Sequence, residues 1–348
     1  MEQKSIALLE ELTQAIGISG DEKEVSRKMK NHLEKLSDEI IYDNLGSVFA
    51  VKKCGKENAK RVMVCAHMDE VGFMLNEIGD NGLAGFIKIG AVSDAALYGS
   101  RVRVKTRTDE VHGIIVADEE GAAKALGKNM KIDLNDSKEV AKLGVMVGDS
   151  AVLDGSFMTL GNRAIAKAID ARFGCALAIE ILEALKDECL DFDLYVGASV
   201  MEEVGQRGGT TATGLIQPDL GIVLDGGAAN DYAGKSNAVG QLGKGVLVRY
   251  YDKGMMPNRA LLDELVSVCE SNQIDYQHYY SMSLTDAAWI HKLFAGCPTL
   301  HVGICARNPH TANAEIDLHD YECAKRSALE VLKGLNASKI DAFKEANR

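Results

Sequence analysis

The sequence ends several apolar runs with acids and histidines, the residue types that bind metals and move protons. In "VMVCAHMDE", His67 and Asp69 close a run that reads as a buried strand. Residues two apart on a strand face the same side, so the carboxylate of Asp69 can lie beside the imidazole of His67. An acid in that place fixes the tautomer of a metal-bound histidine. The alternative is a histidine near a loop with a surface acid.

Two further strand-like runs end in carboxylates. In "GASVMEEVGQRGG", Glu202 and Glu203 follow an apolar segment and precede a glycine-rich helix start. Burying an unpaired charge is costly, so one of the two could bind a metal while its neighbour serves as a general base. In "LGIVLDGG", Asp225 closes the strand. The alternatives are a solvated acidic turn for the glutamates and a turn-forming Asp-Gly for Asp225.

Two more candidates lie outside the strand ends. Asp170 stands in "KAIDARFGC", near the start of a long helix, and His310 stands in "ARNPHTANAE", after a late strand. Each alone would be an exposed helix acid or a loop histidine. Together with the strand-end residues they form a set of imidazoles and carboxylates that suits Zn²⁺, Mn²⁺ or Co²⁺. A catalytic zinc takes three protein ligands, so this larger set suits two metals that share one carboxylate.

The elements that must position these residues read as an α/β fold with an insertion. Ligand sites of open α/β sheets lie at the carboxyl ends of the strands, where the candidates fall. We predict a mixed, mostly parallel sheet sandwiched by helices, formed by residues 1–71 and 161–348. Residues 72–160 carry short β runs separated by Gly and Asp turns, which predicts an inserted small β-barrel domain. Within it we expect a solvated acidic loop at 118–120 and a short helix at 136–144.

Local patterns predict several boundaries. Helical spacing indicates helices over 5–17 and 21–36, with Ser19 or Asp21 as the cap of the second. The stretch 40–53 reads as a hairpin, and 164–185 reads as one long helix.

Composition limits the classes of partner. The chain has 348 residues and a net charge of −12, which disfavours nucleic acid and anionic membranes as partners. Its N-terminus is an amphipathic helix pattern without the apolar core of a signal peptide, and no run is long enough to span a bilayer. The eight cysteines are scattered without a C-x-x-C, which is typical of reduced thiols. We therefore expect a cytoplasmic protein.

The order of "AHMDEVGFM", "AIDARFGC", "MEEVGQRGG", "IVLDGG" and a late "RNPHT" resembles that of the TET-type glutamyl/deblocking aminopeptidases, metallopeptidase family 42. Further matches at "GISGDEKEV", "DNLGSVFAVKKCG" and "DLHDYECA" extend the resemblance over essentially the whole chain. The resemblance implies a zinc-aminopeptidase-like fold, peptide substrates and an inserted domain that makes dimer contacts. It also implies a homo-oligomer that assembles towards a hollow dodecamer.

The resemblance also implies a role for each candidate. Asp170 matches the bridging ligand, and the other metal ligands are His67, Asp225, Glu203 and His310. Glu202 matches the general base, and Asp69 matches the acid that orients His67. The implied reaction removes the N-terminal residue of a peptide through a metal-bridging hydroxide, with two divalent ions (Zn²⁺, Co²⁺ or Mn²⁺) per subunit.

Other hydrolases are alternatives. A serine hydrolase is disfavoured because the sequence has no G-x-S-x-G, and no cysteine stands at a strand–helix junction with His and acid partners. A related dinuclear metal deacylase or carboxypeptidase shares the H-x-D and Glu-Glu patterns and stays open. A non-catalytic scaffold is a further alternative, against which the intact ligand set argues.

Overall fold

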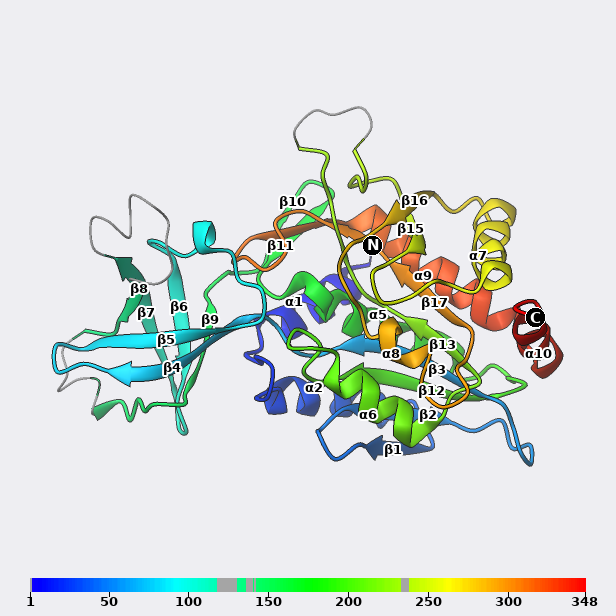
Figure 1. Cartoon of the computed structure of the whole chain (residues 1–348), viewed down its shortest axis with the longest axis horizontal. Coiled ribbons are helices and arrows are strands. Elements are labelled where there is room, and N and C mark those ends of the chain that lie inside the picture. The colour runs from blue at the N-terminus through cyan, green and yellow to red at the C-terminus, as the bar shows by residue number, and fades with distance from the viewer. Residues whose placement is uncertain (1, 118–129, 136–139, 141, 233–237) are drawn as a thin grey trace.

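The chain folds into a helix-covered sheet and a separate β-barrel, which lie side by side along the longest axis of the molecule (Figure 1). The computed structural model describes residues 2–117, 130–135, 140, 142–232 and 238–348. The predicted acidic loop at 118–120 and much of the predicted helix at 136–144 lie outside the described residues. The barrel strands fall between Gly72 and Leu153, so the barrel interrupts the α/β part in sequence.

The α/β part is built on an eight-stranded sheet with the order β1-β2-β12-β3-β13-β17-β15-β16. Its strands are β1 (Glu39–Tyr42), β2 (Val48–Lys52), β3 (Arg61–His67), β12 (Asp193–Ser199), β13 (Leu220–Val223), β15 (Val246–Tyr251), β16 (Tyr276–Tyr280) and β17 (Thr299–Gly303). The four central neighbours β12, β3, β13 and β17 are parallel, whereas β1, β2 and β12 pair antiparallel, as do β15 and β17. The predicted mixed, mostly parallel sheet is confirmed.

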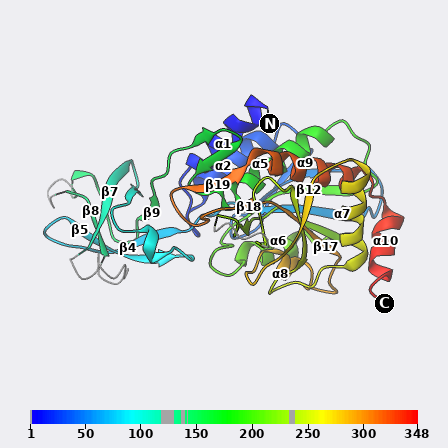
Figure 2. The same ribbon diagram turned by 90° about the horizontal axis from the view of Figure 1, so that it is seen from above.

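Helices cover both faces of this sheet, as the view from above shows (Figure 2). One face carries α1 (Gln3–Gln14), α2 (Lys23–Leu33), α5 (Ile169–Leu185), α7 (Arg259–Ser271) and α9 (Leu318–Lys333). The other carries α6 (Arg207–Ile216) and α8 (Ala287–Ile290), and α10 (Ala337–Glu345) ends the chain. Because both faces are covered, the central strands are apolar along nearly their whole length.

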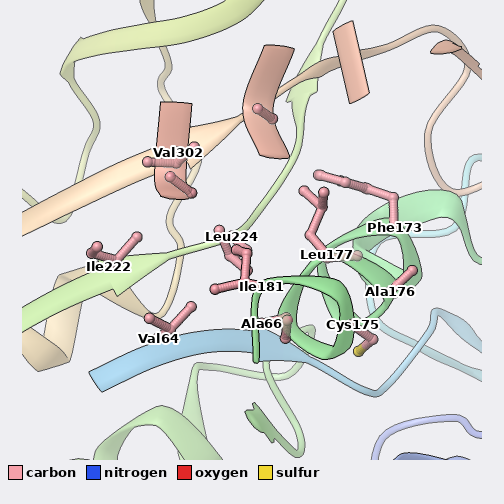
Figure 3. Packing of buried hydrophobic residues seen from close by; sticks show 14 of the residues in the cluster. Val64, Ala66, Phe173, Cys175, Ala176, Leu177, Ile181, Ile222, Leu224 and Val302 are labelled. Atoms are coloured by element: carbon pink, nitrogen blue, oxygen red, sulfur yellow. The ribbon is translucent and has the colours of Figure 1, made fainter. Parts of the chain in front are cut away.

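The long helix α5 packs directly on the middle of the sheet (Figure 3). Its Leu177 and Ile181 lie among the side chains of the β3 and β13 segments. A Cβ on Gly174 would stand 2.3 Å from the carbonyl oxygen of Leu224, so only glycine allows this close approach. This contact fixes the N-terminal end of α5 against the carboxyl ends of the strands.

The inserted part is a closed barrel of six strands in the order β4-β5-β8-β7-β6-β9, with its own apolar interior. Its strands are β4 (Gly72–Ile78), β5 (Leu83–Ile89), β6 (Arg101–Lys105), β7 (Glu110–Ala117), β8 (Met130–Asp133) and β9 (Ser150–Leu153), with a 3₁₀ turn η1 (Asp94–Ala96). Closure leaves no exposed sheet edge, which allows so small a unit to be stable. The predicted small β-barrel is confirmed.

Two smaller sheets accompany the eight-stranded sheet and the barrel. A three-stranded sheet is formed by β10 (Met158–Leu160), β11 (Arg163–Ala166) and β19 (Ala314–Asp317), and a two-stranded one by β14 (Gly227–Ala228) and β18 (Cys305–Ala306). The prediction of one helix over 164–185 is wrong at its start, because residues 163–166 pair with β19. The alanine-rich sequence favours a helix locally, but the long-range ladder with β19 prevails.

The capping prediction for the second helix is also wrong. The helix α2 begins at Lys23, and its N-cap residue Glu22 makes no side-chain capping bond. The hydroxyl of Ser19 instead donates to the carboxylate of Asp69, and Asp21 contacts Lys105 and Ser150 of the barrel. Both side chains are used for contacts with residues far away in the sequence.

Candidate metal centre

His67 stands at the end of β3 and is almost fully buried, with 3% of its surface exposed. Its Nδ1 lies 3.1 Å from the backbone oxygen of Asp69 and 3.5 Å from a carboxylate oxygen of the same residue. A proton on Nδ1 satisfies these acceptors and leaves the Nε2 lone pair free to bind a metal. Nε2 faces Asp170 and Asp225 at 3.8 and 3.7 Å.

The Asp69 carboxylate does more than the predicted orientation of His67. Its two oxygens accept hydrogen bonds from the backbone nitrogens of Glu202 and Glu203, at 2.9 and 3.0 Å, and from the Ser19 hydroxyl at 2.7 Å. Burial alone would raise the pKa of Asp69, but His67 and these donors lower it below its ordinary value. Asp69 therefore stays ionised and ties the end of β3 to the turn after β12.

Asp225 and Asp170 complete the group around His67. Asp225 follows β13, and its Oδ1 accepts the backbone N–H of Gly226 at 2.6 Å. Asp170 lies at the start of α5, where its backbone (φ −82°, ψ 115°) and that of Ala171 are not helical, just before the regular part of the helix. Burial alone would raise the pKa of Asp170, but the nearby imidazoles of His310 and His67 lower it.

A second group lies on the other side of Asp170. The Nε2 of His310 lies 3.5 Å from Asp170 Oδ2 and 3.2 Å from Glu203 Oε1. Its Nδ1 lies 3.2 Å from the backbone oxygen of Ala91, in the segment that leaves the barrel strand β5. Burial alone would lower the pKa of His310, but Asp170 and Glu203 raise it to about 11.

The structure thus brings the five predicted ligands together as two groups that share Asp170. The ligand atoms of His67, Asp170 and Asp225 lie within 4.8 Å of one another, and so do those of Asp170, Glu203 and His310. Asp170 Oδ1 is buried and has no hydrogen-bond partner among the residues that the structure describes. A buried carboxylate oxygen without a partner needs a cation, and oxygen and imidazole donors fit Zn²⁺, Mn²⁺ or Co²⁺.

Glu202 lies beside these groups with 6% of its surface exposed. Its Oε1 accepts a hydrogen bond from Gln206 Nε2 at 3.0 Å. Burial raises the pKa of Glu202 well above its ordinary value, and the nearby charge of Asp225 adds to the effect. A carboxylate with a raised proton affinity beside a metal group is suited to accept a proton.

Sequence reasoning missed the buried Lys167, which lines a small cavity with Asp170, Glu203 and His310. Lys167 Nζ donates to both carboxylate oxygens of Glu70, at 2.7 and 2.9 Å. Burial lowers its pKa to about 8. The only signal was a lysine inside the apolar stretch 164–169.

Sequence comparison identifies the family of the chain. A sequence model of the M42 glutamyl aminopeptidase family matches residues 46–326, which is most of the chain. The chain belongs to this M42 family. A glutamyl aminopeptidase of Lactococcus lactis subsp. cremoris (strain MG1363) is 30% identical over 346 residues, which cover 96% of this chain and 97% of that protein.

Solved structures of aminopeptidases are similar to this M42 chain over nearly its whole length. A TET aminopeptidase from the marine sediment archaeon Thaumarchaeota archaeon SCGC AB-539-E09 superposes with a TM-score of 0.93 at 33% identity, over 98% of this chain and 100% of that one. PhTET1-12s, solved as a dodecamer, has a TM-score of 0.85 at 27% identity, over 96% of this chain and 100% of that one.

Membership in the M42 family makes the chain an aminopeptidase, a hydrolase of peptide bonds that depends on divalent metal ions. The resemblance seen in the sequence motifs is therefore confirmed. Among the described residues, none of the helices combines the length and apolarity that crossing a bilayer requires. The roles of the individual site residues stay a prediction.

Proposed function

We propose that each subunit binds two divalent ions, Zn²⁺, Co²⁺ or Mn²⁺, and removes the N-terminal residue of peptides. His67 and Asp225 would hold one ion, Glu203 and His310 the other, and Asp170 would contact both. The single observation that carries this proposal is the pair of ligand groups that meet at Asp170. One group alone would already be a full catalytic site, so the shared carboxylate favours two ions.

In this proposal Glu202 is the general base. The bound ions would lower the pKa of a water molecule between them and polarise the scissile carbonyl. Glu202 would take the proton of the attacking water and transfer it to the nitrogen of the leaving amine. Gln206 holds one oxygen of Glu202, which restricts the rotamer of the carboxylate. Asp69 would keep His67 in the tautomer that leaves Nε2 free.

Two substitutions test these roles. Glu202→Gln should retain metal and lower kcat by roughly 100-fold or more, because it removes the base and keeps the shape of the side chain. Asp170→Ala should lose metal from both groups, measured by metal analysis after dialysis. Full turnover in the first variant, or two ions per chain in the second, would contradict the assignment.

Peptides blocked at one end test the aminopeptidase activity against the deacylase and carboxypeptidase activities that the sequence motifs alone left open. A peptide with a free α-amine, its N-acetyl form and its C-terminal amide distinguish the three activities. We expect the free and C-amidated peptides to lose their first residue and the acetylated peptide to stay intact. Cleavage of the acetylated peptide, or dependence on a free carboxylate, would favour the alternative.

We further propose that the barrel-bearing insertion, within residues 72–160, makes dimer contacts in an assembly of twelve chains. Two findings support this: the structural neighbour PhTET1-12s is a dodecamer, and apolar side chains of the insertion are exposed, among them Tyr98 and Val147. Native mass spectrometry should give a mass near twelve times the 37.5 kDa of the chain. A monomer at micromolar concentration would contradict the proposal.

A cytoplasmic location is also proposed. It is supported by the eight cysteines, which are all free thiols. Fractionation of the native host should recover the enzyme with cytoplasmic markers, and recovery with secreted proteins would contradict it.

A further inference from the structure

The turn that follows β12 delivers both Glu202 and Glu203, and buried carboxylates hold three consecutive backbone N–H groups of this turn. The nitrogens of Glu202 and Glu203 donate to Asp69, at 2.9 and 3.0 Å. The nitrogen of Met201 donates to Oε1 of Glu22 at 3.0 Å. Met201 has a φ of 54°, a left-handed conformation that residues with a side chain rarely adopt, so contacts from outside the turn must hold it.

Glu22 is well placed to hold this turn. It is 5% exposed, and its Oε1 also accepts the backbone N–H of Gly20 at 2.8 Å. It stands directly before α2, which packs against β2 and α5. Its carboxylate makes no capping bond to its own helix, and its hydrogen bonds to Gly20 and Met201 tie the N-terminal segment to the turn.

The two carboxylates divide the turn between them. Asp69 accepts from Glu202 and from the proposed metal ligand Glu203, whereas Glu22 accepts at Met201, which adjoins Glu202 and is one residue further from Glu203. A change at Glu22 should therefore move Glu202 more than Glu203. Catalytic groups that are misplaced by about 1 Å can lose roughly 100-fold in rate.

We propose that Glu22 is a positioning residue for the aminopeptidase reaction, which fixes the place of the Glu202 carboxylate by holding the backbone N–H of Met201. The inference rests on the proposed role of Glu202. Because a general base acts in the transition state, loss of the Glu22 contact lowers kcat and leaves KM unchanged. The contact requires an acceptor oxygen close enough to the N–H of Met201, and it does not require the negative charge of Glu22.

Two conservative variants separate reach from charge. Glu22→Gln keeps an acceptor oxygen at the same distance and loses the charge; Glu22→Asp keeps the charge and withdraws the oxygen by one methylene. We expect Glu22→Asp to lower kcat by about 10-fold or more and Glu22→Gln to stay within about 3-fold of the native enzyme. KM and metal content should be unchanged in both.

Glu24 supplies the matched control. It lies in the first turn of α2, and its Oε2 accepts the backbone N–H of Ile16 at 3.3 Å, away from the turn. Glu24→Asp and Glu24→Gln should leave kcat unchanged. Hydrogen exchange of the peptide that covers residues 200–206, measured on metal-free protein, should accelerate in Glu22→Asp alone. This readout requires no activity.

Several outcomes would overturn the inference. One is an unchanged kcat in Glu22→Asp. The others are an equal loss of kcat in Glu22→Gln and Glu22→Asp, and hydrogen exchange that accelerates over the whole chain instead of over residues 200–206. Glu202→Gln, assayed in parallel, reports separately on the proposed base: its full activity would remove that role whatever Glu22 does. In the Glu202→Gln background Glu22→Asp should cause no further loss, and a further tenfold drop would show that Glu22 acts by another route.

Discussion

At the scale of single residues, the carboxylates of this site have different tasks because they have different hydrogen-bond donors. Asp69 receives two backbone N–H groups and a hydroxyl, which lower its pKa together with His67. Glu202 is also buried but receives one amide donor from Gln206, and its pKa rises well above the ordinary value. One acid is therefore a fixed anchor, and the other is suited to exchange a proton.

Glu22 also has a raised pKa, and this predicts how its substitution changes stability with pH. Burial, with a smaller effect of the Asp69 charge, raises the pKa of Glu22 from 4.5 to about 7. The folded protein then binds a proton more tightly than the unfolded chain, so the free energy of unfolding falls as pH rises from 4.5 to 7.

Glu22→Gln cannot ionise and should escape this loss. In metal-free protein, the variant should be more stable than the native chain at pH 8 by on the order of 1–3 kcal/mol, with the difference much smaller at pH 4.5. Urea unfolding at both pH values measures it. A difference that is constant with pH would show that ionisation of Glu22 costs the fold nothing.

At the scale of elements, the proposed metal centre depends on how closely α5 approaches the sheet. Asp170 directly precedes the regular part of α5, so a shift of this helix should move its carboxylate relative to the proposed ligands at the strand ends. Gly174, one turn further along, sets the approach through its contact with the backbone of Leu224. The packing of one glycine thereby positions a residue that contributes to both ligand groups.

Gly174→Ala should separate α5 from the sheet. We expect a loss of about 1–3 kcal/mol in the free energy of unfolding, as in other overpacked cores, together with weaker metal binding. Gly214→Ala in α6 is the matched control, because a Cβ at Gly214 would meet no atom within 4 Å. It should stabilise the protein by about 0.4–1 kcal/mol. Chemical denaturation and metal titration of both variants check the prediction. It would be wrong if the two substitutions changed the free energy of unfolding in the same direction.

At the scale of the whole molecule, the inserted barrel reaches the metal centre of the α/β part. The segment after β5 places the backbone oxygen of Ala91 against His310. Gly90, one residue earlier, has a φ of 78°, and a Cβ there would stand 3.3 Å from the Cβ of Glu203 and 2.7 Å from Val71. The barrel therefore supports one of the two ligand groups in addition to its proposed part in assembly.

Gly90→Ala should weaken the metal group of Glu203 and His310 more than the group of His67 and Asp225. We expect about 10-fold weaker binding of one of two ions, a typical effect of a disturbed ligand support. Gly99→Ala is the control, since Gly99 has a φ of 76° and open space around it. It shares the backbone strain without the contact, so isothermal titration should show native affinity for both ions. Equal weakening in both variants would assign the effect to strain in the barrel.

The sequence by itself determined the fold class, the presence of a barrel and the candidate ligands. The reason is physical: the carboxyl ends of parallel strands meet at one edge of a sheet, so acids and a histidine at those ends must be neighbours. His67, Asp225 and Glu203 were found in this way. Asp170 and His310 lie outside the strand ends; they were added to the set as further metal-binding residue types, and the family motif order gave them their roles.

Only the tertiary structure decided what supports these ligands and where some elements begin. The bond between Glu22 and Met201 joins residues 179 positions apart, and the bond between His310 and Ala91 joins residues 219 apart. Ser19, which a local pattern assigned to a helix cap, is engaged by Asp69, and the start of α5 is displaced by the ladder between β11 and β19. Such contacts leave no periodic or local trace in the sequence, because they depend on which distant surfaces the packed sheet and helices bring together.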